Sequence, residues 1–285
     1  MGTADIKLGY SCNNNCIFCA VKHHPAGNKS TGQYIAEMES ARARNNRIVI
    51  TGGEPTIRDD FANLVRAAKM LGYRITIQTN GRRFSDELFC RDISSLGVSN
   101  FLVSIHGHEA EIHERLTGVA NSFRETEQGI INLLHHNQNV QTNSVMTVQN
   151  TPYLNHLTKY LIHLGITNIM FSYLDICGAV LDNIEILPEY SKIVEKMGEV
   201  ITECKGSAVK VCFDNIPLCQ MPPEYRKYAT EKRKIDLIMH DYQILEFKAN
   251  TIIDSCLRCA VRSYCCHPQQ KYIDLFGNQF NPILK

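Results

Sequence analysis

Residues 12–19 read Cys-Asn-Asn-Asn-Cys-Ile-Phe-Cys, and the interpretation of the whole chain starts from this stretch. Its three cysteines, Cys12, Cys16 and Cys19, follow a short strand-like run at residues 6–10. A structural zinc site usually takes four protein ligands, and a [4Fe–4S] cluster held by cysteine alone also takes four. Three thiolates on one tight loop therefore predict a metal cluster with one iron left open for a small molecule. The alternative interpretation is a partial zinc knuckle, or chance clustering in a cysteine-rich chain.

The chain has 285 residues and a formal net charge of +1 at pH 7. This length is near the upper limit for one hydrophobic core, so one large domain with an appendage is expected. The near-neutral charge gives no electrostatic reason to expect a nucleic-acid partner. No apolar run is long enough to span a membrane, and residues 1–10 do not read as a signal peptide. We therefore expect a cytoplasmic protein with no membrane and no nucleic-acid partner.

Twelve cysteines are many for a chain of this size, and most of them fall into two groups. Because no signal peptide is predicted, their clustered spacing favours metal binding over disulfides. The first group is the loop at residues 12–19. The second group consists of Cys212, Cys219, Cys256, Cys259, Cys265 and Cys266. The scattered cysteines between the groups are expected to be small buried hydrophobic residues: Cys90, Cys177 and Cys204.

Strand-like and helix-like segments alternate from the N-terminus to about residue 204. The expected strands are residues 6–10, 47–51, 73–79, 100–105, 140–148 and 168–174. The expected helices are residues 33–44, 61–71, 84–96, 123–135, 152–164 and 188–204. This alternation predicts a parallel sheet with crossover helices, and six strands rather than eight predict an open side. The predicted fold class is therefore α/β, with a partial (β/α)6 TIM-like barrel at residues 1–204.

Four motifs directly follow predicted strands. They are the cysteine loop, Gly52-Gly53-Glu54-Pro55, Thr79-Asn80-Gly81 and His106-Gly107. In barrels of this kind the chemistry lies at the C-terminal ends of the strands. The sequence therefore predicts one functional rim that carries all four motifs.

After residue 204 the alternation stops. A strand-like segment at residues 209–213 is followed by a polar stretch at residues 222–241 and then by most of the second cysteine group. This region has too little apolar content for a core of its own, which predicts that a metal ties it together. Residues 205–285 are therefore predicted to form a small auxiliary iron–sulfur subdomain.

With the cysteine loop and the turn Thr51-Gly52-Gly53-Glu54-Pro55 both in place, residues 5–204 resemble the radical S-adenosylmethionine (SAM) superfamily. More narrowly, the chain looks like the branch that holds the molybdenum-cofactor GTP cyclase and the peptide-modifying maturases. Residues 104–107 (SIHG) and 113–118 (HERLTG) also look like that branch. The resemblance implies that the open iron binds SAM and that one electron splits SAM into methionine and a 5′-deoxyadenosyl radical. It also implies a flavodoxin- or ferredoxin-type electron donor.

The resemblance further implies an enzyme that abstracts a hydrogen atom from its substrate through this radical. A peptide or natural-product precursor is the preferred substrate class, and a small molecule (a sugar, cyclitol or nucleotide) is the alternative. A rival from another class is a non-catalytic iron–sulfur redox protein, and a third is a zinc-binding interaction module. A redox protein would not need the turn at residues 52–55, so this turn favours the enzyme.

By the same resemblance, the rim supplies the residues that bind SAM. The predicted set is Phe18, Gly52, Gly53, Glu54, Pro55, Thr79, Ser104 and Asn143. The two glycines let the backbone approach a ligand closely, and this edge is expected to bind the methionine amino group. Glu54 either lies near that ammonium group or serves as a charge at a helix N-terminus. The backbone around Phe18 is expected near adenine.

The three strand-end residues of the set are candidates for the ribose and carboxylate of SAM: Thr79, Ser104 and Asn143. Their alternative role is that of plain polar caps. His106 and His108, on the same rim, either contact substrate or are hydrogen-bonded structural residues.

The second cysteine group resembles the CxxCxxxxxC core of twitch and SPASM auxiliary-cluster domains, with Cys256, Cys259 and Cys265 in that spacing. Cys219 is the preferred fourth ligand, and Cys212 and Cys266 compete with it. A full SPASM domain needs a further cysteine where this chain has Gln269, so one additional [4Fe–4S] cluster is the expected number. The alternative is a structural zinc site with the same four residues.

Overall fold

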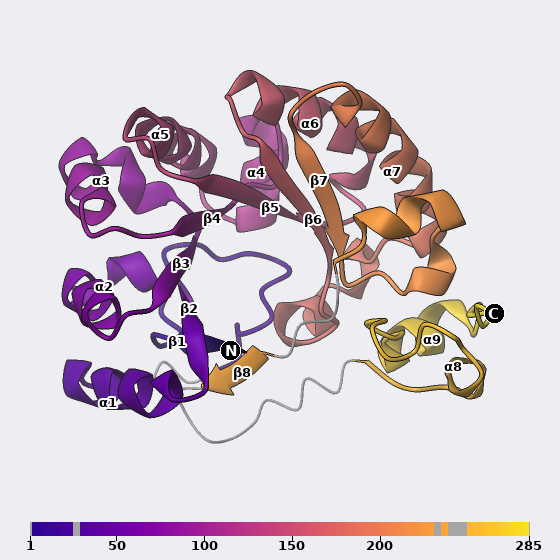
Figure 1. Cartoon of the computed structure of the whole chain (residues 1–285). Coiled ribbons are helices and arrows are strands. Elements are labelled where there is room, and N and C mark those ends of the chain that lie inside the picture. Colours follow the sequence, from indigo (N-terminus) through magenta and orange to yellow (C-terminus); the bar gives the residue numbers. More distant parts are fainter. Residues whose placement is uncertain (1, 25–28, 231–234, 239–249, 285) are drawn as a thin grey trace.

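The structure is a computed structural model and describes residues 2–24, 29–230, 235–238 and 250–284. Its centre is one parallel sheet with the strand order β7-β6-β5-β4-β3-β2-β1-β8 (Figure 1). The strands are β1 Gly2–Lys7, β2 Asn45–Thr51, β3 Arg74–Thr79, β4 Asn100–Ser104, β5 Val140–Met146, β6 Asn168–Tyr173, β7 Lys210–Asp214 and β8 Ile235–Ile238. The sheet curves and stays open between its two edges.

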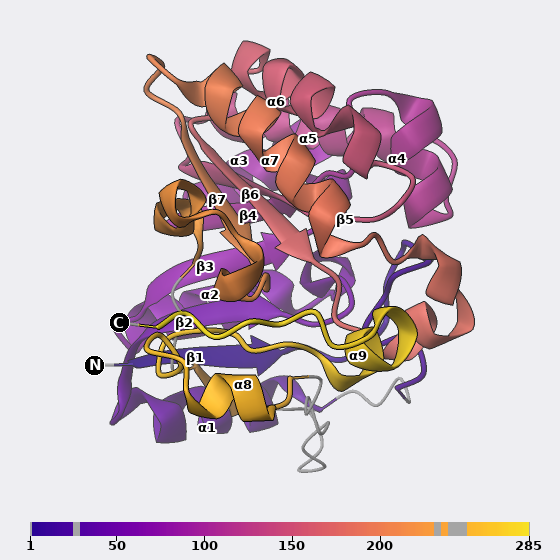
Figure 2. The ribbon, with the colours of Figure 1, turned by 90° about the vertical axis from the view of Figure 1, so that its right-hand side faces the viewer.

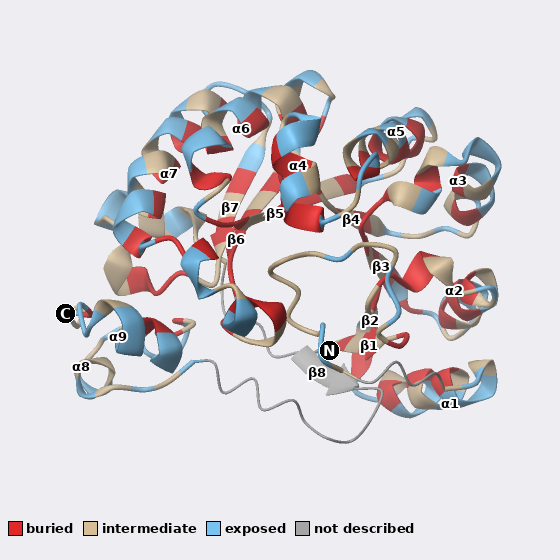
Figure 3. Cartoon of the chain, turned by 180° about the vertical axis from the view of Figure 1, so that it is seen from behind, coloured by how far each residue is buried: buried red, intermediate tan, exposed pale blue. Residues whose placement is uncertain are grey.

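Most of the longer helices cover the convex face of the sheet (Figures 1 and 3). They are α1 Thr31–Arg42, α2 Phe61–Met70, α3 Glu87–Ser94, α5 Ser122–His135, α6 Leu154–His163 and α7 Tyr190–Cys204. Helix α4 Ala110–Thr117 lies instead at the C-terminal ends of the strands (Figure 2). Two short helices, α8 Asp254–Leu257 and α9 Gln270–Phe276, belong to the C-terminal segment. No helix within the described part of the chain has the length and apolar character needed to cross a membrane.

Residue alternation along each strand explains which side of the sheet carries the core. In β3, Ile75 and Ile77 are fully buried against the helices, whereas Thr76 and Gln78 are only half-buried on the other side. Successive side chains of a strand point to opposite faces, so the helix-facing residues form the core and the concave face is left more polar. The loop that follows β1 lies on this concave side (Figure 1).

The predicted α/β class with an open partial barrel is confirmed, but the strand number of six is wrong. The segment at residues 209–213 continues the sheet as β7, which pairs in parallel with β6. Its Val211 and Phe213 are buried, as in the preceding strands. The short β8 adds a parallel partner to β1 at the other edge. The division of the chain at residue 204 is not tested by these pairings and stays a prediction.

The C-terminal segment packs beside β7 at the open side of the sheet (Figure 2). Tyr190 at the start of α7 stacks on Tyr272 of α9, with ring centroids 4.2 Å apart, and Phe280 packs edge-on against both rings. The Tyr272 hydroxyl accepts a hydrogen bond of 3.0 Å from the backbone N–H of Tyr190. The segment therefore shares the hydrophobic core of the barrel, which compensates for its low apolar content.

Candidate functional site

The cysteine loop follows β1 and carries three thiols that influence one another electrostatically. Burial raises the pKa of Cys16 to about 12, and the charges of Cys12 and Cys19 add to this effect. Enclosure by protein also raises the pKa of Cys12 to about 11, although part of that residue is exposed to solvent. Three thiolates held this close repel each other, and a cationic iron–sulfur centre would remove the repulsion. The donor set therefore fits a cluster.

Backbone hydrogen bonds fix the cysteine loop from two sides. On the strand side, the N–H of Gly53 donates to the carbonyl of Gly9, and the N–H of Glu54 donates to the carbonyl of Ser11, both at 2.9 Å. On the helix side, Asn15 and Ile17 donate at 2.9 and 3.0 Å to the last carbonyls of α4. These carbonyls have no partner inside the helix, so they are free to accept from the loop.

Arg82 also holds the cysteine loop in place, a role that was not predicted from the sequence. Arg82 begins the 3₁₀ helix η2 (Arg82–Ser85), which follows β3. Its guanidinium donates to the carbonyl of Asn13, to Asn14 Oδ1 at 2.9 Å and to Glu125 Oε2 at 2.5 Å. Asn80 Nδ2 also donates to Asn13 Oδ1 at 2.6 Å. The planar guanidinium can satisfy several acceptors at once, so it fixes the loop more firmly than an ammonium would.

Gly52 and Gly53 allow another backbone segment to approach closely, and the segment that does so is residues 8–11 of the same chain. A Cβ atom on Gly53 would lie 2.3 Å from the carbonyl oxygen of Ser11 and 2.5 Å from that of Tyr10. A Cβ atom on Gly52 would lie 2.5 Å from the carbonyl oxygen of Gly9, and Gly52 also has a φ of +150°. These glycines therefore let β2 pack directly against the backbone that leads into Cys12. Their role in binding SAM stays a prediction.

The Glu54 carboxylate is buried and already makes four hydrogen bonds. Its Oε1 accepts from the Thr56 N–H at 3.1 Å, the Thr56 hydroxyl at 2.6 Å and the Thr79 hydroxyl at 2.8 Å. Its Oε2 accepts from the Asn80 N–H at 2.6 Å. Burial raises the pKa of Glu54, and these hydrogen bonds oppose the rise. Glu54 caps the short helix η1 (Pro55–Ile57), so it fits the helix N-terminal alternative considered from the sequence.

Of the remaining predicted SAM-binding residues, Thr79 and Ser104 end β3 and β4, whereas Asn143 lies inside β5 and does not end it as predicted. Ser104 and Asn143 are direct partners in the pairing of β4 with β5, and the Asn143 side chain accepts a 2.7 Å hydrogen bond from Ser172. The Thr79 hydroxyl points instead toward Glu54. Phe18 packs edge-on against His106, with ring centroids 4.8 Å apart. The structure thus places Phe18, Ser104 and Asn143 at one rim, and their contacts with SAM stay a prediction.

His106 is held as a neutral, buried ring. Its Nδ1 accepts from the Val145 N–H at 3.3 Å, and its own backbone N–H donates to His113 Nδ1 at 3.1 Å. Burial, and then the charge of His113, hold the pKa of His106 well below its usual value. His108 lies farther out and stacks on His156, with centroids 5.3 Å apart. These hydrogen bonds fit a structural role for His106, and substrate contact stays a prediction for both residues.

Four cysteines of the second group line one small cavity in the C-terminal segment: Cys219, Cys256, Cys259 and Cys265. Cys219 comes from the 3₁₀ helix η6 (Leu218–Gln220) after β7, and Cys256 comes from α8. Burial raises the pKa of Cys219 to about 11, and the charges of Cys265 and Cys256 add to this effect. The fold therefore brings together the same four thiols that the sequence analysis grouped, which fits a fully coordinated cluster.

The two competing cysteines do not line this cavity. Cys212 lies within β7, opposite Met170 of β6. Cys266 hydrogen-bonds to Cys265, and that bond lowers the pKa of Cys265 to about 6, helped by the N–H groups of His267 and Leu218. Cys266 thus stabilises a neighbouring thiolate. The assignment of Cys219 as the fourth ligand is favoured by these positions and stays a prediction.

Gln269 occupies the position at which a second auxiliary cluster would need a cysteine. Its buried side chain attaches the C-terminal segment to the barrel. It is 1% exposed, its Oε1 accepts from the Ile176 N–H at 2.8 Å, and its Nε2 donates to the Leu174 carbonyl at 2.6 Å. These bonds join the C-terminal segment to the loop after β6. The position is therefore used to dock the segment on the barrel.

Two aspartates near the ends of β6 and β7 influence nearby cysteines. The charges of Asp175 and Cys19 raise the pKa of Cys177, after the larger effect of burial, and the charge of Asp214 adds to the raised pKa of Cys266. Burial raises the pKa of Asp175 to about 6, and the neighbouring Asp214 adds to the rise. Part of Asp175 is nevertheless exposed to solvent.

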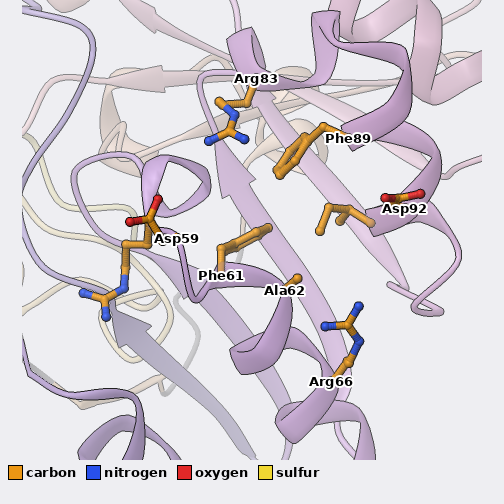
Figure 4. A pocket seen from close by; sticks show the side chains of 9 residues that line it. Asp59, Phe61, Ala62, Arg66, Arg83, Phe89 and Asp92 are labelled. Carbon is orange, nitrogen blue, oxygen red and sulfur yellow. The ribbon is translucent and has the colours of Figure 1, made fainter.

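A separate pocket lies in the helix layer and contains no predicted site residue. It is lined by Arg58, Asp59, Phe61, Ala62, Arg66, Arg83, Phe89, Asp92 and Ile93, which come from α2, α3 and the loops before them (Figure 4). Arg83 lies over the ring of Phe89 at 4.4 Å from its centroid. The pocket has no cysteine, so it is distinct from the rim that carries the thiols.

The fold and the three-cysteine loop define an iron–sulfur enzyme built on an open α/β barrel, and comparison with known proteins identifies the family. The sequence model of the Radical SAM superfamily matches residues 6–164, and the chain belongs to this superfamily. It is an enzyme that uses a [4Fe–4S] cluster and SAM, as the resemblance implied.

The matching curated relatives include two enzymes with different printed activities. An "AdoMet-dependent heme synthase" of Oleidesulfovibrio alaskensis is 32% identical over 159 residues, which cover 54% of this chain and 41% of the relative. A "Probable GTP 3',8-cyclase" of Saccharolobus islandicus is 32% identical over 129 residues, which cover 44% of this chain and 41% of the relative. Each match thus spans less than half the length of the relative.

Among solved structures, Streptococcus suis SuiB bound to S-adenosylmethionine matches with a TM-score of 0.72 and 16% identity, covering 99% of this chain and 76% of that one. SuiB bound to the precursor peptide SuiA matches with a TM-score of 0.69 and 16% identity, covering 99% and 74%. At this identity the match establishes the fold, and it includes the C-terminal segment.

Proposed function

We propose that this chain holds a [4Fe–4S] cluster through Cys12, Cys16 and Cys19, cleaves SAM reductively, and abstracts a hydrogen atom from a peptide or natural-product precursor. The observation that carries the proposal is the loop at residues 12–19, whose three thiols are held together at the C-terminal rim of the sheet. When bound, such a cluster supplies the single electron that splits SAM into methionine and a 5′-deoxyadenosyl radical.

The chain's own residues would hold the reactants in place around this loop. Ser104 and Asn143 are paired on adjacent strands, and the Ser104 hydroxyl and the Asn143 NH2 group are available to a ribose or a carboxylate, whereas the Asn143 Oδ1 already accepts from Ser172. Phe18 offers an aromatic surface, which suits stacking against adenine. Gly53 and Glu54 would act indirectly, since their N–H groups hold the backbone that leads into Cys12.

We assign a second, fully coordinated [4Fe–4S] cluster to Cys219, Cys256, Cys259 and Cys265. Their common cavity supports this assignment, and so do the N–H groups that favour a thiolate at Cys265. A cluster with four thiolate ligands has no open iron, so its expected role is electron transfer or structural support beside the barrel mouth. A flavodoxin- or ferredoxin-type protein is the expected electron donor for the enzyme.

The peptide class of substrate is supported by the fold match to SuiB, which extends over the C-terminal segment and includes a complex with a precursor peptide. The GTP 3′,8-cyclase relatives support a small-molecule substrate instead, but their match covers only 44% of this chain. We therefore favour a peptide and keep a nucleotide as the second candidate.

The test uses the anaerobically reconstituted protein with dithionite and SAM, and it measures 5′-deoxyadenosine. We expect deoxyadenosine from the wild type and none from Cys16→Ala, because a lost thiolate removes or misligates the SAM-binding cluster. Cleavage that persists at the wild-type rate in Cys16→Ala would refute the assignment. Candidate peptides and GTP, each labelled with deuterium, are then compared for transfer of the label into deoxyadenosine, and only the true substrate class transfers it.

A further inference from the structure

Three side chains with metal-binding atoms meet on the helix layer, far in sequence from both cysteine groups. They are Glu87, His135 and His136, and one ligand atom from each lies within 4.8 Å of the other two. Glu87 is the first residue of α3, whereas the two histidines stand at the end of α5. The fold therefore brings the three ligands together from positions about fifty residues apart.

The contact between the two helices is already formed. His136 Nε2 lies 2.7 Å from Glu87 Oε1, and the His136 side chain is only 21% exposed. Two ligands bound to one zinc ion at about 2.0–2.1 Å stand roughly 3 Å apart along an edge of the coordination polyhedron. The measured separation is close to that edge, so a bound ion requires only a small adjustment of these two groups.

The local backbone fixes the histidine end of this contact. The His136 N–H donates to the Asn132 carbonyl at 3.0 Å, and Gln138 Nε2 donates to the His136 carbonyl at 2.8 Å. Asn137 takes a φ of +55° and so ends the helix directly after the pair. The C-terminal end of a helix carries partial negative charge, which favours a cation at this position.

We propose that Glu87, His135 and His136 form a surface site for a divalent transition-metal ion of the zinc class, which joins the start of α3 to the end of α5. Imidazole and carboxylate ligands suit zinc and its neighbours, and three protein ligands leave one coordination position for water. None of the three residues belongs to either cysteine group, so the site does not depend on the proposed function.

The chain offers a matched control at the other side of the barrel. His23 Nε2 lies 2.8 Å from Asp182 Oδ2, and these side chains are 60% and 58% exposed. Within the described ranges of the chain, no third histidine, cysteine, aspartate or glutamate completes a ligand group there. This pair has nearly the same contact distance but lacks a third ligand, so it should not hold the ion.

The experiment titrates Zn²⁺ into holoprotein with both clusters reconstituted, so that iron occupies the cysteines, and follows binding by calorimetry. We expect one saturable site, at least tenfold weaker binding in each of Glu87→Gln, His135→Asn and His136→Asn, and no change in His23→Asn. Full wild-type affinity in any of the three ligand variants would overturn the three-ligand site.

Zinc K-edge absorption of the wild type gives a second measurement that needs no variant. Imidazole scattering with nitrogen and oxygen near 2.0–2.1 Å is the expected result. A sulfur shell near 2.3 Å would place the ion on cysteines, and the absence of saturable binding would remove the site; either result would overturn the proposal.

Discussion

Gly53→Ala tests whether the turn after β2 builds the cysteine loop. The new Cβ atom would lie 2.3 Å from the Ser11 carbonyl oxygen and 2.5 Å from that of Tyr10. Both neighbours are backbone atoms, so the steric clash is removed only if the loop that leads to Cys12 moves by about 1 Å. Such a shift would stretch two backbone hydrogen bonds of 2.9 Å, from Gly53 to Gly9 and from Glu54 to Ser11, beyond their useful range.

The expected loss in the free energy of unfolding follows from those two hydrogen bonds. A buried N–H left without a partner costs about 1–3 kcal/mol, so two of them cost about 2–6 kcal/mol. That is a large part of the total stability of a typical domain, about 5–15 kcal/mol. If this edge only bound the methionine amino group, as expected from the sequence, a side chain at this position would weaken SAM binding and leave the first cluster intact. The structure predicts instead that the first cluster is lost as well, because Cys12 is displaced.

The assay measures iron and sulfide per chain after anaerobic reconstitution, together with SAM affinity by calorimetry. We expect Gly53→Ala to lose about four iron atoms, one cluster, and its SAM binding. Gly32→Ala is the matched control, because no atom lies within 4 Å of its Cβ position and it stands in the exposed first turn of α1. A Gly53→Ala protein with full iron content and unchanged SAM affinity would refute this reasoning.

Two further sets of substitutions separate the residues that hold the first cysteine loop in place from the proposed ligands of the second cluster. Arg82→Lys keeps the charge but loses the planar contact with several acceptors, so we expect a chelator to remove the first cluster at least several times faster than from the wild type. Arg83→Lys is the control and should lose the cluster at the wild-type rate. Equal rates in the two variants would contradict the role of Arg82. Cys256→Ala and Cys219→Ala should each lose about four iron atoms and still cleave SAM, whereas Cys212→Ala should keep the full iron content. If Cys212→Ala loses the iron and Cys219→Ala keeps it, Cys212 is the fourth ligand.

Most of the proposed cluster ligands could be grouped from the sequence because their signal is short-ranged. The spacing of Cys12, Cys16 and Cys19 places three thiols on one loop, whatever the rest of the fold does. The same holds for Cys256 and Cys259, which lie within one turn of each other. Alternation of strands and helices likewise predicted the barrel, since each element carries its own hydrophobic pattern.

The residues that hold the cysteine loop in place could not be predicted, because their partners are distant in sequence and their residue types are common on protein surfaces. Arg82 and Asn80 contact the loop across 67 to 69 residues of chain, and nothing in the local sequence marks these contacts. Residues 209–213 were predicted to be strand-like but were left outside the barrel, because the alternation of strands and helices stops after residue 204. Helix α4 was missed, although its last carbonyls hold the loop at Asn15 and Ile17.

The two proposed cluster sites of this chain are built on different physical principles. The first loop is fixed by backbone bonds to the turn after β2 and to α4, and by Arg82, so much of its ordering entropy is lost when the barrel folds. A preordered loop binds a cluster without a further ordering cost. The proposed ligands of the C-terminal segment come from η6, α8 and the chain after them, and the segment is attached to the barrel through Gln269 and the aromatic contacts of Tyr272. Metal binding there would contribute directly to folding, so removal of iron should loosen this segment before it disturbs the barrel.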